Sequence, residues 1–314
     1  MKHCLYCGRI LDEPHMHGWH QRCIRSFFGT KEMPILDIDE ANLGLHATHS
    51  GYTVPGVQKK LSLSLDHTKQ TDRLTLVGKP PGYIVKLQTE AYEALPELEH
   101  VVMHMAKIAK IATVPNALIQ LHDGSLAYIA KRIDRIFKKD RVIQLPMEDF
   151  CQLTGRLTED KYQGSYEQCG TIIRTYSRQH MLDLTNFWYV LVFCFITGNS
   201  DMHLKNFSLY APVNEHFQLT PAYDLLPVQL ILPEDTQEMA LTLRGKKSRL
   251  KRTDFLGLAE HLEIPEQVAI RLIKRVSGLF PQWEALISES CMPNQLKPAL
   301  TELVKTRIDR ITTE

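Results

Sequence analysis

Residues 187–206 read FWYVLVFCFITGNSDMHLKN and join the most apolar stretch of the chain to its densest polar cluster. The segment 187–196 carries no charge, which predicts a buried helix, and Gly198 is well suited to end that helix. In the polar cluster, Asp201 and Asn206 are five positions apart, the D-x-x-x-x-N spacing of a phosphotransferase catalytic loop. The stretch therefore predicts a core helix that leads directly into a loop of catalytic side chains.

The chemistry of such a loop needs a base and metal ligands. In a phosphotransferase the Asp accepts the proton of the attacking hydroxyl, and the Asn offers a neutral oxygen to magnesium. Downstream, Asp224 lies in the segment Pro-Ala-Tyr-Asp and adds a second carboxylate. Mg²⁺ prefers one or two carboxylates together with phosphate oxygens, so Asn206 and Asp224 are sufficient as protein ligands. Asp201 is the candidate base.

Two charged residues upstream complete a set of kinase parts. Lys86 ends an alternating strand, where its ammonium group is able to neutralise nucleotide phosphates, and Glu99 begins the following helix. An ion pair between them would hold the lysine in place. Each residue alone also has an ordinary explanation, since Asp201 could cap a helix and the other two could be solvated surface charges. The order of Lys86, Glu99, Asp201, Asn206 and Asp224 along the chain favours the kinase interpretation.

The hydrophobic pattern predicts a β-rich part followed by a helical part. Strand-like alternation and turn residues mark strands at 61–65, 73–77, 83–87, 117–121 and 126–130. A helical period from Leu98 to Ile108 predicts one helix inserted in this small antiparallel sheet. Later helices are expected from a cap at Asn186 through residue 196, and near 254–262, 265–279 and 294–312. We expect a two-lobed α+β architecture.

Three parts of the chain follow from this pattern. They are a Cys/His-rich head at 1–35, a small β-rich lobe at 36–131 and a larger helical lobe at 132–314. In the head, Cys4-x2-Cys7 and His20-x2-Cys23 have zinc-ribbon-like spacing. These four residues are candidate ligands of a structural Zn²⁺, with His3, His15 and His17 as spare candidates. The alternative is a reduced, metal-free head.

Composition limits the class of protein. The chain has 314 residues, 44% of them hydrophobic and 23% charged, so it is able to bury a core. With 37 Lys and Arg against 36 Asp and Glu, the net charge of +1 does not favour nucleic acid as the default partner. The seven cysteines are an odd number, and the chain opens without an apolar leader. We expect a cytoplasmic protein with free thiols and no membrane segment; delivery into another cell would leave no mark in the sequence.

A basic run lies between Arg244 and Arg252. It contains Arg244, Lys246, Lys247, Arg249, Lys251 and Arg252. A solvated face or loop is the ordinary interpretation of such a run. The alternative is a docking site for nucleic acid, such as a tRNA or an operator DNA.

Five segments of this sequence resemble one known family. They are Val54-Pro-Gly-Val-Gln-Lys-Lys60, Met147-Glu-Asp-Phe-Cys-Gln152, Asp160-Lys-Tyr-Gln-Gly-Ser165, Asn199-Ser-Asp-Met-His-Leu-Lys-Asn-Phe-Ser208 and Pro221-Ala-Tyr-Asp224. In order and content they resemble HipA-like serine/threonine kinases, toxins of bacterial toxin–antitoxin systems. The resemblance implies a protein-kinase-like fold, ATP with Mg²⁺, and transfer of phosphate to a protein hydroxyl. It implies that Asp201 is the base, that Asn206 and Asp224 hold the metal, and that Lys86 contacts the phosphates.

The resemblance also implies further site residues. The cofactor-binding residues expected from it are Lys86, Glu99, Gly56, Val57, Gln58, Lys60, His203 and Lys205. In the family, the loop that precedes the first strand bears a hydroxyl residue whose autophosphorylation shuts the kinase off, and Thr53 falls on that position. Pro55 replaces a second hydroxyl found in some members, and Ser50 is a nearby substitute.

The matching segment begins near residue 50, as in the short form called HipT. That form implies two separate partners, a small HipS-like protein and a HipB-like DNA-binding antitoxin, so DNA would be contacted only through the antitoxin. The target implied by the family is an aminoacyl-tRNA synthetase, whose phosphorylation stalls translation. One alternative is a nucleotide-binding pseudokinase that acts as a binding module in an antitoxin complex. Another is a zinc-bearing nucleic-acid adaptor, against which the near-neutral charge argues.

Overall fold

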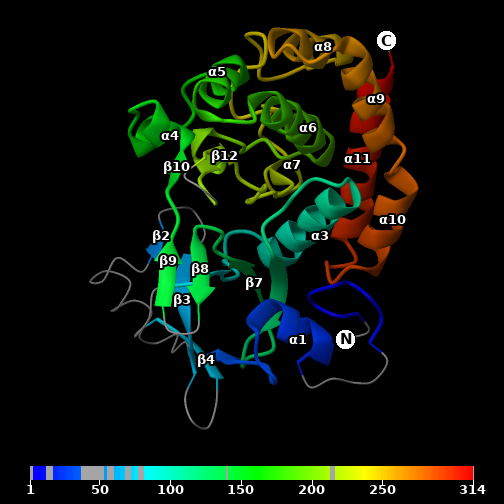
Figure 1. Ribbon diagram of the computed structural model, residues 1–314. Helices are drawn as coiled ribbons and strands as arrows, with labels where there is room; N and C mark the ends of the chain where they lie inside the picture. The colour runs from blue at the N-terminus through cyan, green and yellow to red at the C-terminus, as the bar shows by residue number, and fades with distance from the viewer. Residues whose placement is uncertain are drawn as a thin grey trace. The chain divides into compact units, whose positions relative to one another are not determined.

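The computed structural model describes residues 3–11, 17–36, 53–54, 60–67, 72–76, 81–138, 141–212 and 216–313. The chain forms two compact units (Figure 1). The first consists of Met1–His100, Val114–Ile143 and Glu289–Cys291, and the second of Val101–Thr113, Gln144–Ser288 and Met292–Glu314.

The first unit is built on a mainly antiparallel sheet. Its strands, in spatial order, are β1 (Ile35–Leu36), β4 (Asp72–Thr75), β3 (Lys60–His67), β5 (Tyr83–Lys86), β7 (Leu126–Lys131) and β6 (Asn116–Gln120), and β2 (Thr53–Val54) pairs with β3. Only the β1–β4 pair among these is parallel. The strands predicted from alternation are therefore present, with ends shifted by a few residues.

Alternation buries one face of this sheet. Val85 on β5 is in register with Leu61 on β3 and with Ile129 on β7, and Ile129 is in register with Ala117 on β6. All four side chains are buried. Because side chains alternate between faces along a strand, residues 84 and 86 of β5 point to the opposite face. The period of two in the sequence thus fixes which face Lys86 occupies.

Among the described residues of the first unit, two helices accompany the sheet. The head contributes α1 (Gln21–Phe28), which ends at Gly29 in the left-handed conformation with φ of 78°. Helix α3 (Leu95–Ile108) begins earlier than the apolar period indicates, with Pro96 in its first turn. Its second half belongs to the second unit, where Trp283 donates its indole N–H to the carbonyl oxygen of Met105 at 3.0 Å. The inserted helix predicted from the sequence is therefore confirmed.

Helix α6 (His180–Thr197) lies at the centre of the second unit, and Figure 1 shows it beside α5 (Tyr166–Tyr176) and α11 (Leu296–Thr312). The start expected at Asn186 is wrong, because the helix begins at His180. Asp183 explains the difference: its buried carboxylate accepts hydrogen bonds from the Ser177 hydroxyl at 2.6 Å and the Leu219 amide at 2.7 Å. Because these partners satisfy the carboxylate, Asp183 can be buried within a helix, and the helix extends before the uncharged segment.

Helix α6 is longer than the uncharged segment 187–196. By length and composition alone its 18 residues would suffice to cross a membrane. However, 72% of this stretch is buried within the protein, as expected of a core helix.

The remaining helices surround α6 and a small sheet. The sheet has the order β10 (Met147–Asp149), β11 (Ser208–Tyr210) and β12 (Gln218–Leu219), and a separate hairpin joins β8 (Arg135–Lys138) to β9 (Arg141–Gln144). The helices are α4 (Phe150–Leu153), α7 (Val228–Ile231), α8 (Arg252–His261), α9 (Glu266–Ser277), α10 (Phe280–Glu289) and α11, with short 3₁₀ turns at Thr158–Asp160 and Leu204–Asn206. The helices predicted near 254–262, 265–279 and 294–312 are confirmed as α8, α9 and α11.

Candidate active site

The polar loop after α6 starts with a sharp change of direction at Gly198. This residue is left-handed, with φ of 71°, and a Cβ added there would lie 2.6 Å from a methyl carbon of Leu303. The Asn199 amide then donates to the carbonyl oxygen of Cys194 at 2.8 Å. Glycine is required both for the backbone conformation and for the close packing. The predicted helix end is therefore confirmed, and it sets the direction in which the loop begins.

Asp201 presents its carboxylate at the surface of the second unit, with 44% of the side chain exposed. One oxygen, Oδ1, accepts a hydrogen bond from the Tyr162 hydroxyl at 2.7 Å. The other, Oδ2, lies 4.0 Å from Nε2 of His203. The Asp201 amide donates to Oδ1 of Asn199 at 3.2 Å, which fixes the backbone beneath the carboxylate. A partly exposed, oriented carboxylate of this kind is able to accept a proton.

Asn206 and Asp224 are tied to the same loop through backbone atoms. The Asn206 side-chain amide donates to the carbonyl oxygen of Asp201 at 2.9 Å, which turns its own side-chain oxygen away from that contact. The Asn199 side chain donates to the carbonyl oxygen of Asp224 at 3.3 Å. Asp224 itself is left-handed, with φ of 56°, an uncommon conformation for a residue other than glycine. Amide and carboxylate oxygens are hard donors, so this pair fits Mg²⁺.

His203 belongs to this loop, and its side chain is buried. Its ring packs edge-on against Tyr162, with the ring centres 5.1 Å apart. Burial lowers the pKa of His203 below its ordinary value, although the nearby charges of Asp201 and Asp224 act in the opposite direction. The imidazole is therefore neutral at pH 7 and acts as packing for Tyr162 and Asp201.

Lys205 makes an ion pair that the sequence did not indicate. Its ammonium group lies 2.7 Å from the carboxylate of Asp149. Asp149 is also the N-cap of α4, where it accepts from the Gln152 amide at 2.9 Å. Lys205 is among the residues expected to bind cofactor, and the structure places its charge on Asp149.

Lys86 and Glu99 form a buried ion pair in the first unit. The ammonium nitrogen of Lys86 donates to both carboxylate oxygens of Glu99, at 2.6 and 2.8 Å, and the two residues are only 5% and 2% exposed. The same nitrogen lies 5.2 Å from the centre of the Tyr128 ring. Lys60 is directly opposite Lys86 in the β3–β5 register, so the two lysines share one face of the sheet.

Several expected residues lie outside the part of the chain that the structure describes. These are Ser50, Pro55, Gly56, Val57 and Gln58. Thr53 is described only as backbone, in β2, where it is in register with Leu61 of β3.

The head brings together the four residues that were expected to bind a metal. The ligand atoms of Cys4, Cys7, His20 and Cys23 all lie within 4.8 Å of one another. Nδ1 of His20 is 3.5 Å from the sulfur of Cys7 and 3.8 Å from that of Cys23. The cluster therefore is able to hold a metal ion. The spare candidate His3 instead lies 3.9 Å from the Glu289 carboxylate, and His15 is outside the described residues.

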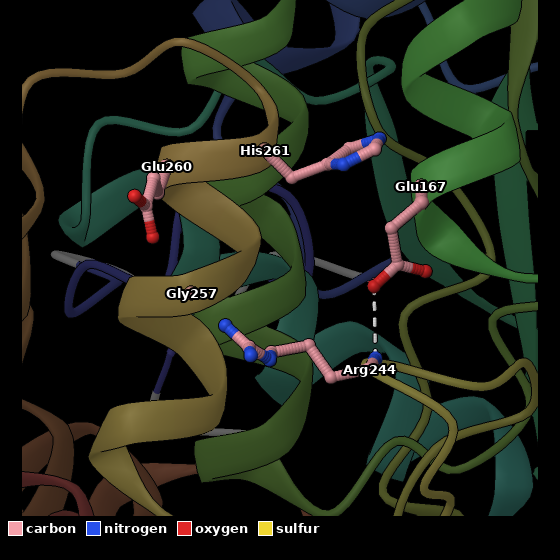
Figure 2. A pocket seen from close by; sticks show the side chains of 5 residues that line it. All are labelled: Glu167, Arg244, Gly257, Glu260 and His261. Atoms are coloured by element: carbon pink, nitrogen blue, oxygen red, sulfur yellow. Dashed lines mark hydrogen bonds between the residues drawn. The ribbon is translucent and has the colours of Figure 1, made fainter.

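Part of the basic run is engaged within its own unit. The Arg244 amide donates to Oε1 of Glu167 at 2.8 Å, beside a hollow lined by Glu167, Arg244, Gly257, Glu260 and His261 (Figure 2). A Cβ on Gly257 would collide with the Arg244 guanidinium, so glycine lets that side chain lie over α8. Lys246 pairs with Asp254 at 2.7 Å. These contacts give the run a role in positioning α8.

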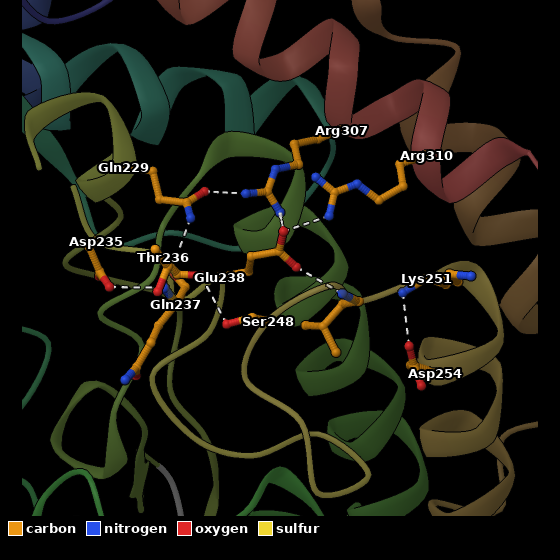
Figure 3. Close-up of polar contacts among 11 residues, drawn as sticks. Gln229, Asp235, Thr236, Gln237, Glu238, Ser248, Lys251, Asp254, Arg307 and Arg310 are labelled. Atoms are coloured by element: carbon orange, nitrogen blue, oxygen red, sulfur yellow. Dashed lines mark hydrogen bonds and ion pairs between the residues drawn. The ribbon is translucent and has the colours of Figure 1, made fainter. Parts of the chain in front are cut away.

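Glu238 anchors the loop 238–250, which contains most of the basic run. Its buried carboxylate lies 3.0 Å from Arg307 and also pairs with Arg310, both on α11 (Figure 3). Its other oxygen accepts from the Leu250 amide at 2.9 Å. Burial lowers the pKa of Arg307 to about 10, which leaves it charged at neutral pH. One carboxylate therefore joins α11 to both ends of the loop.

Comparison with known proteins assigns the chain to a family. The family model described as the HipA-like C-terminal domain matches residues 52–283, which include the Lys86–Glu99 pair and the Asp201 loop. The chain belongs to this HipA-like family. The fold expected from the resemblance and the membership itself are thus confirmed, whereas the HipT form stays a prediction.

Two relatives of this HipA-like chain carry the name "Putative kinase". Y4dM of Sinorhizobium fredii is 30% identical over 252 residues, which cover 74% of this chain and 59% of Y4dM. A Haemophilus influenzae protein is 25% identical over 285 residues, which cover 83% of this chain and 81% of that protein. The chain thus spans less than two thirds of the length of Y4dM.

Two solved structures share the fold. The Shewanella oneidensis toxin HipA, in a complex with HipB and operator DNA, superposes with a TM-score of 0.70 at 19% identity, covering 87% of this chain and 71% of HipA. The Helicobacter pylori proinflammatory kinase CtkA gives a TM-score of 0.55 at 16% identity, covering 84% and 92%. The α+β fold, with a sheet unit and a helical unit as in these kinases, is confirmed.

The structure adds one residue to the site of this HipA-like protein. Tyr162 lies in the motif Asp160–Ser165, and its hydroxyl contacts the carboxylate of Asp201. The two residues are 39 positions apart, so no local spacing connects them. The sole signal in the sequence was the place of Tyr162 inside one of the motifs.

Proposed function

We propose that the chain is a toxin kinase that transfers the γ-phosphoryl group of ATP to a serine or threonine hydroxyl of a protein. One observation carries the proposal. Asp201 presents an exposed carboxylate, while Asn206 is hydrogen-bonded to its carbonyl oxygen and Asp224 is joined to it through Asn199. The proposed base and metal ligands are thus joined by hydrogen bonds, Asn206 directly to the backbone of Asp201 and Asp224 through the side chain of Asn199.

Each side chain then has a stated task. When bound, Mg²⁺ and ATP supply the transferred phosphoryl group and neutralise the charge that develops on it. Tyr162 occupies Oδ1 of Asp201 and leaves Oδ2 to accept the proton of the attacking hydroxyl. The oxygen that loses this proton forms the new bond to phosphorus, and ADP leaves with the electrons of the broken bond. Asn206 and Asp224 would hold the metal through their side-chain oxygens.

The first unit supplies cations for the phosphates. Lys86 is held by Glu99, so its ammonium group is fixed before any nucleotide arrives. Lys60 lies opposite Lys86 and directly follows the loop 53–59 expected to cover the phosphates. The proposal assigns both lysines to the nucleotide phosphates, Lys86 from its pair with Glu99 and Lys60 from the neighbouring strand.

The head cluster takes a structural ion in this proposal. Three thiolates and one imidazole are soft and borderline ligands, the set that tetrahedral Zn²⁺ prefers. With four protein ligands, the ion would have no open position for water, so it would serve structure and leave catalysis to the Asp201 loop.

Targets and partners are proposed from the family. We expect an aminoacyl-tRNA synthetase as substrate, so that phosphorylation inhibits translation in the cytoplasm. A HipB-like DNA-binding antitoxin is a suitable partner, since the Shewanella HipA was solved with HipB and operator DNA. A HipS-like small protein would complete the short, HipT-type system, and DNA would be contacted only through the antitoxin.

A test identifies substrate and activity together. The full chain is induced in a host cell, γ-labelled ATP is supplied to the lysate, and the labelled proteins are sequenced by mass spectrometry. Label on one synthetase, lost with Asp224→Asn, supports the proposal. Nucleotide binding without any transfer to protein would favour the pseudokinase alternative instead.

A further inference from the structure

The head is hydrogen-bonded to the edge strand of the nucleotide-binding sheet. Leu118 lies in the middle of β6, at the end of the strand order, and its amide donates to the carbonyl oxygen of Leu5 at 2.9 Å. Its carbonyl oxygen accepts the indole N–H of Trp19 at 3.1 Å. Both backbone groups of one edge residue are therefore satisfied by the head, which closes this part of the sheet edge.

The two head residues that make these contacts are neighbours of the cluster. Leu5 follows Cys4, and Trp19 precedes His20. The Leu5 amide also donates to the carbonyl oxygen of Gly18 at 2.9 Å, which joins the two ligand-bearing segments. Any ion that fixes Cys4 and His20 therefore fixes the two contacts with Leu118.

Aromatic rings extend the attachment to the strand that carries Lys86. Trp19 packs against Phe27 and Phe28 of α1, with ring centres 5.5 and 5.4 Å apart. Phe27 and Phe28 in turn lie 5.9 and 5.6 Å from the ring of Tyr83, the first residue of β5. Tyr83 and Lys86 point to opposite faces of β5 because they are three residues apart. The head thus covers the face of the sheet behind Lys86.

The cluster has the tautomer that a metal needs. Nε2 of His20 is 3.0 Å from the carbonyl oxygen of Ile10, and a carbonyl oxygen only accepts, so Nε2 must carry the proton. In the neutral imidazole Nδ1 is then the acceptor, and it is the atom that faces the sulfurs of Cys7 and Cys23. A partner on the second nitrogen is the usual support of a metal-binding histidine.

A head this small needs such an ion. Its single helix has 8 residues, too short to be stable alone, and small domains of this size use metals or disulfides in place of a large core. All seven cysteines are free thiols, so no disulfide does this work. We infer that Zn²⁺ at Cys4, Cys7, His20 and Cys23 locks the head onto β5 and β6 and thereby makes nucleotide binding at Lys86 depend on the metal.

The nucleotide part of this inference rests on the proposed kinase function. The test therefore includes a readout that does not depend on that function. Full-length protein, purified without chelator, is compared with Cys4→Ser/Cys7→Ser and with Cys291→Ser, which removes an exposed thiol outside the cluster. Zinc content, melting temperature, hydrogen exchange at the Leu118 amide and ATP affinity are measured. As a control for poor folding of the double variant, wild-type protein is also stripped with a chelator and reloaded with Zn²⁺.

We expect one zinc per chain in wild type and Cys291→Ser, and none in the double variant. Loss of zinc should expose the Leu118 amide to exchange and weaken ATP binding by roughly five- to tenfold, a common size for coupling between sites. Reloading should reverse both effects. Trp19→Phe removes the N–H donor to the Leu118 carbonyl oxygen and shrinks a buried ring without changing a cluster residue, so it should keep zinc and lose part of the protection of the neighbouring Leu118 amide.

Three results would overturn the inference. They are wild-type protein without zinc, zinc removal that leaves Leu118 exchange unchanged, and removal that exposes Leu118 but leaves ATP affinity unchanged. If zinc-loaded wild type binds no ATP at all, the proposed kinase function fails, while Leu118 exchange still reports whether zinc holds the head on the sheet.

Discussion

The Tyr162 hydroxyl donates a hydrogen bond to Oδ1 of Asp201 across 2.7 Å. Burial and this carboxylate raise the pKa of Tyr162 above its ordinary value, so the phenol stays protonated and remains a donor at neutral pH. The contact holds one carboxylate oxygen and leaves the other available. Tyr162 is therefore a positioning residue for the proposed base, separate from the metal ligands.

Replacing this hydroxyl tests that role. Tyr162→Phe should lower kcat by roughly tenfold, because a hydrogen bond to a charged group contributes about 1.5–3 kcal/mol. The KM for ATP should stay unchanged, since no nucleotide contact is removed. Tyr176→Phe changes an exposed tyrosine in the same unit and is the matched control. A kcat equal to wild type in Tyr162→Phe would show that the carboxylate is oriented without this bond.

The buried Lys86–Glu99 pair allows stability to be separated from nucleotide binding. Lys86→Met leaves Glu99 buried without its partner and should cost about 3–5 kcal/mol in the free energy of unfolding. The double variant Lys86→Met/Glu99→Leu should recover much of that stability, because an apolar pair often replaces a buried ion pair without loss. ATP binding, measured by calorimetry, should remain lost in both. ATP affinity at wild-type strength in the double variant would remove Lys86 from the phosphate contacts.

Control by autophosphorylation gives a prediction at Thr53. A phosphate there adds roughly −1.5 to −2 charges at pH 7 and should repel the nucleotide phosphates or draw the loop toward nearby lysines. Thr53→Asp should therefore weaken ATP binding and reduce toxicity, while Thr53→Ala should bind ATP normally and lose the main autophosphorylation signal. Phosphopeptide mapping after incubation with ATP and Mg²⁺ is the measurement. Phosphate found only outside residues 50–56 would exclude this control.

Glu238 gives a prediction on stability. Glu238→Gln should lower the free energy of unfolding by about 3 kcal/mol, because it leaves the buried Arg307 without its anionic partner. Glu263→Gln breaks an exposed pair with Arg174 and should cost less than about 1 kcal/mol. Urea unfolding of the two variants provides the comparison. Equal losses would mean that the Glu238 network does not depend on charge.

The parts of this structure that were predicted correctly rest on local signals. Alternation placed β3, β5, β6 and β7, and Gly198 marked the end of α6 because only its own backbone conformation is involved. The spacing of Cys4 and Cys7 likewise predicted two members of one cluster.

What the sequence missed depends on distant partners. The start of α6 at His180 depends on Asp183, whose partners include Leu219, 36 positions away. The ion pair of Lys205 with Asp149 spans 56 positions, and the hydrogen bond from Tyr162 to Asp201 joins two separate motifs. Such contacts follow from packing, which the pattern of one segment does not contain.

The rate of phosphoryl transfer in Asp201→Asn tests whether this loop is the catalytic centre. The side-chain amide introduced by this substitution has the size of the carboxylate and keeps the contact with Tyr162, but it does not accept a proton. The rate of transfer to protein should therefore fall by a factor of roughly 10²–10⁴. ATP affinity and melting temperature should match wild type, since the proposed nucleotide contacts lie on other residues. Transfer at the wild-type rate in this variant would contradict the assignment of Asp201 as the base and, with it, the mechanism proposed for the protein.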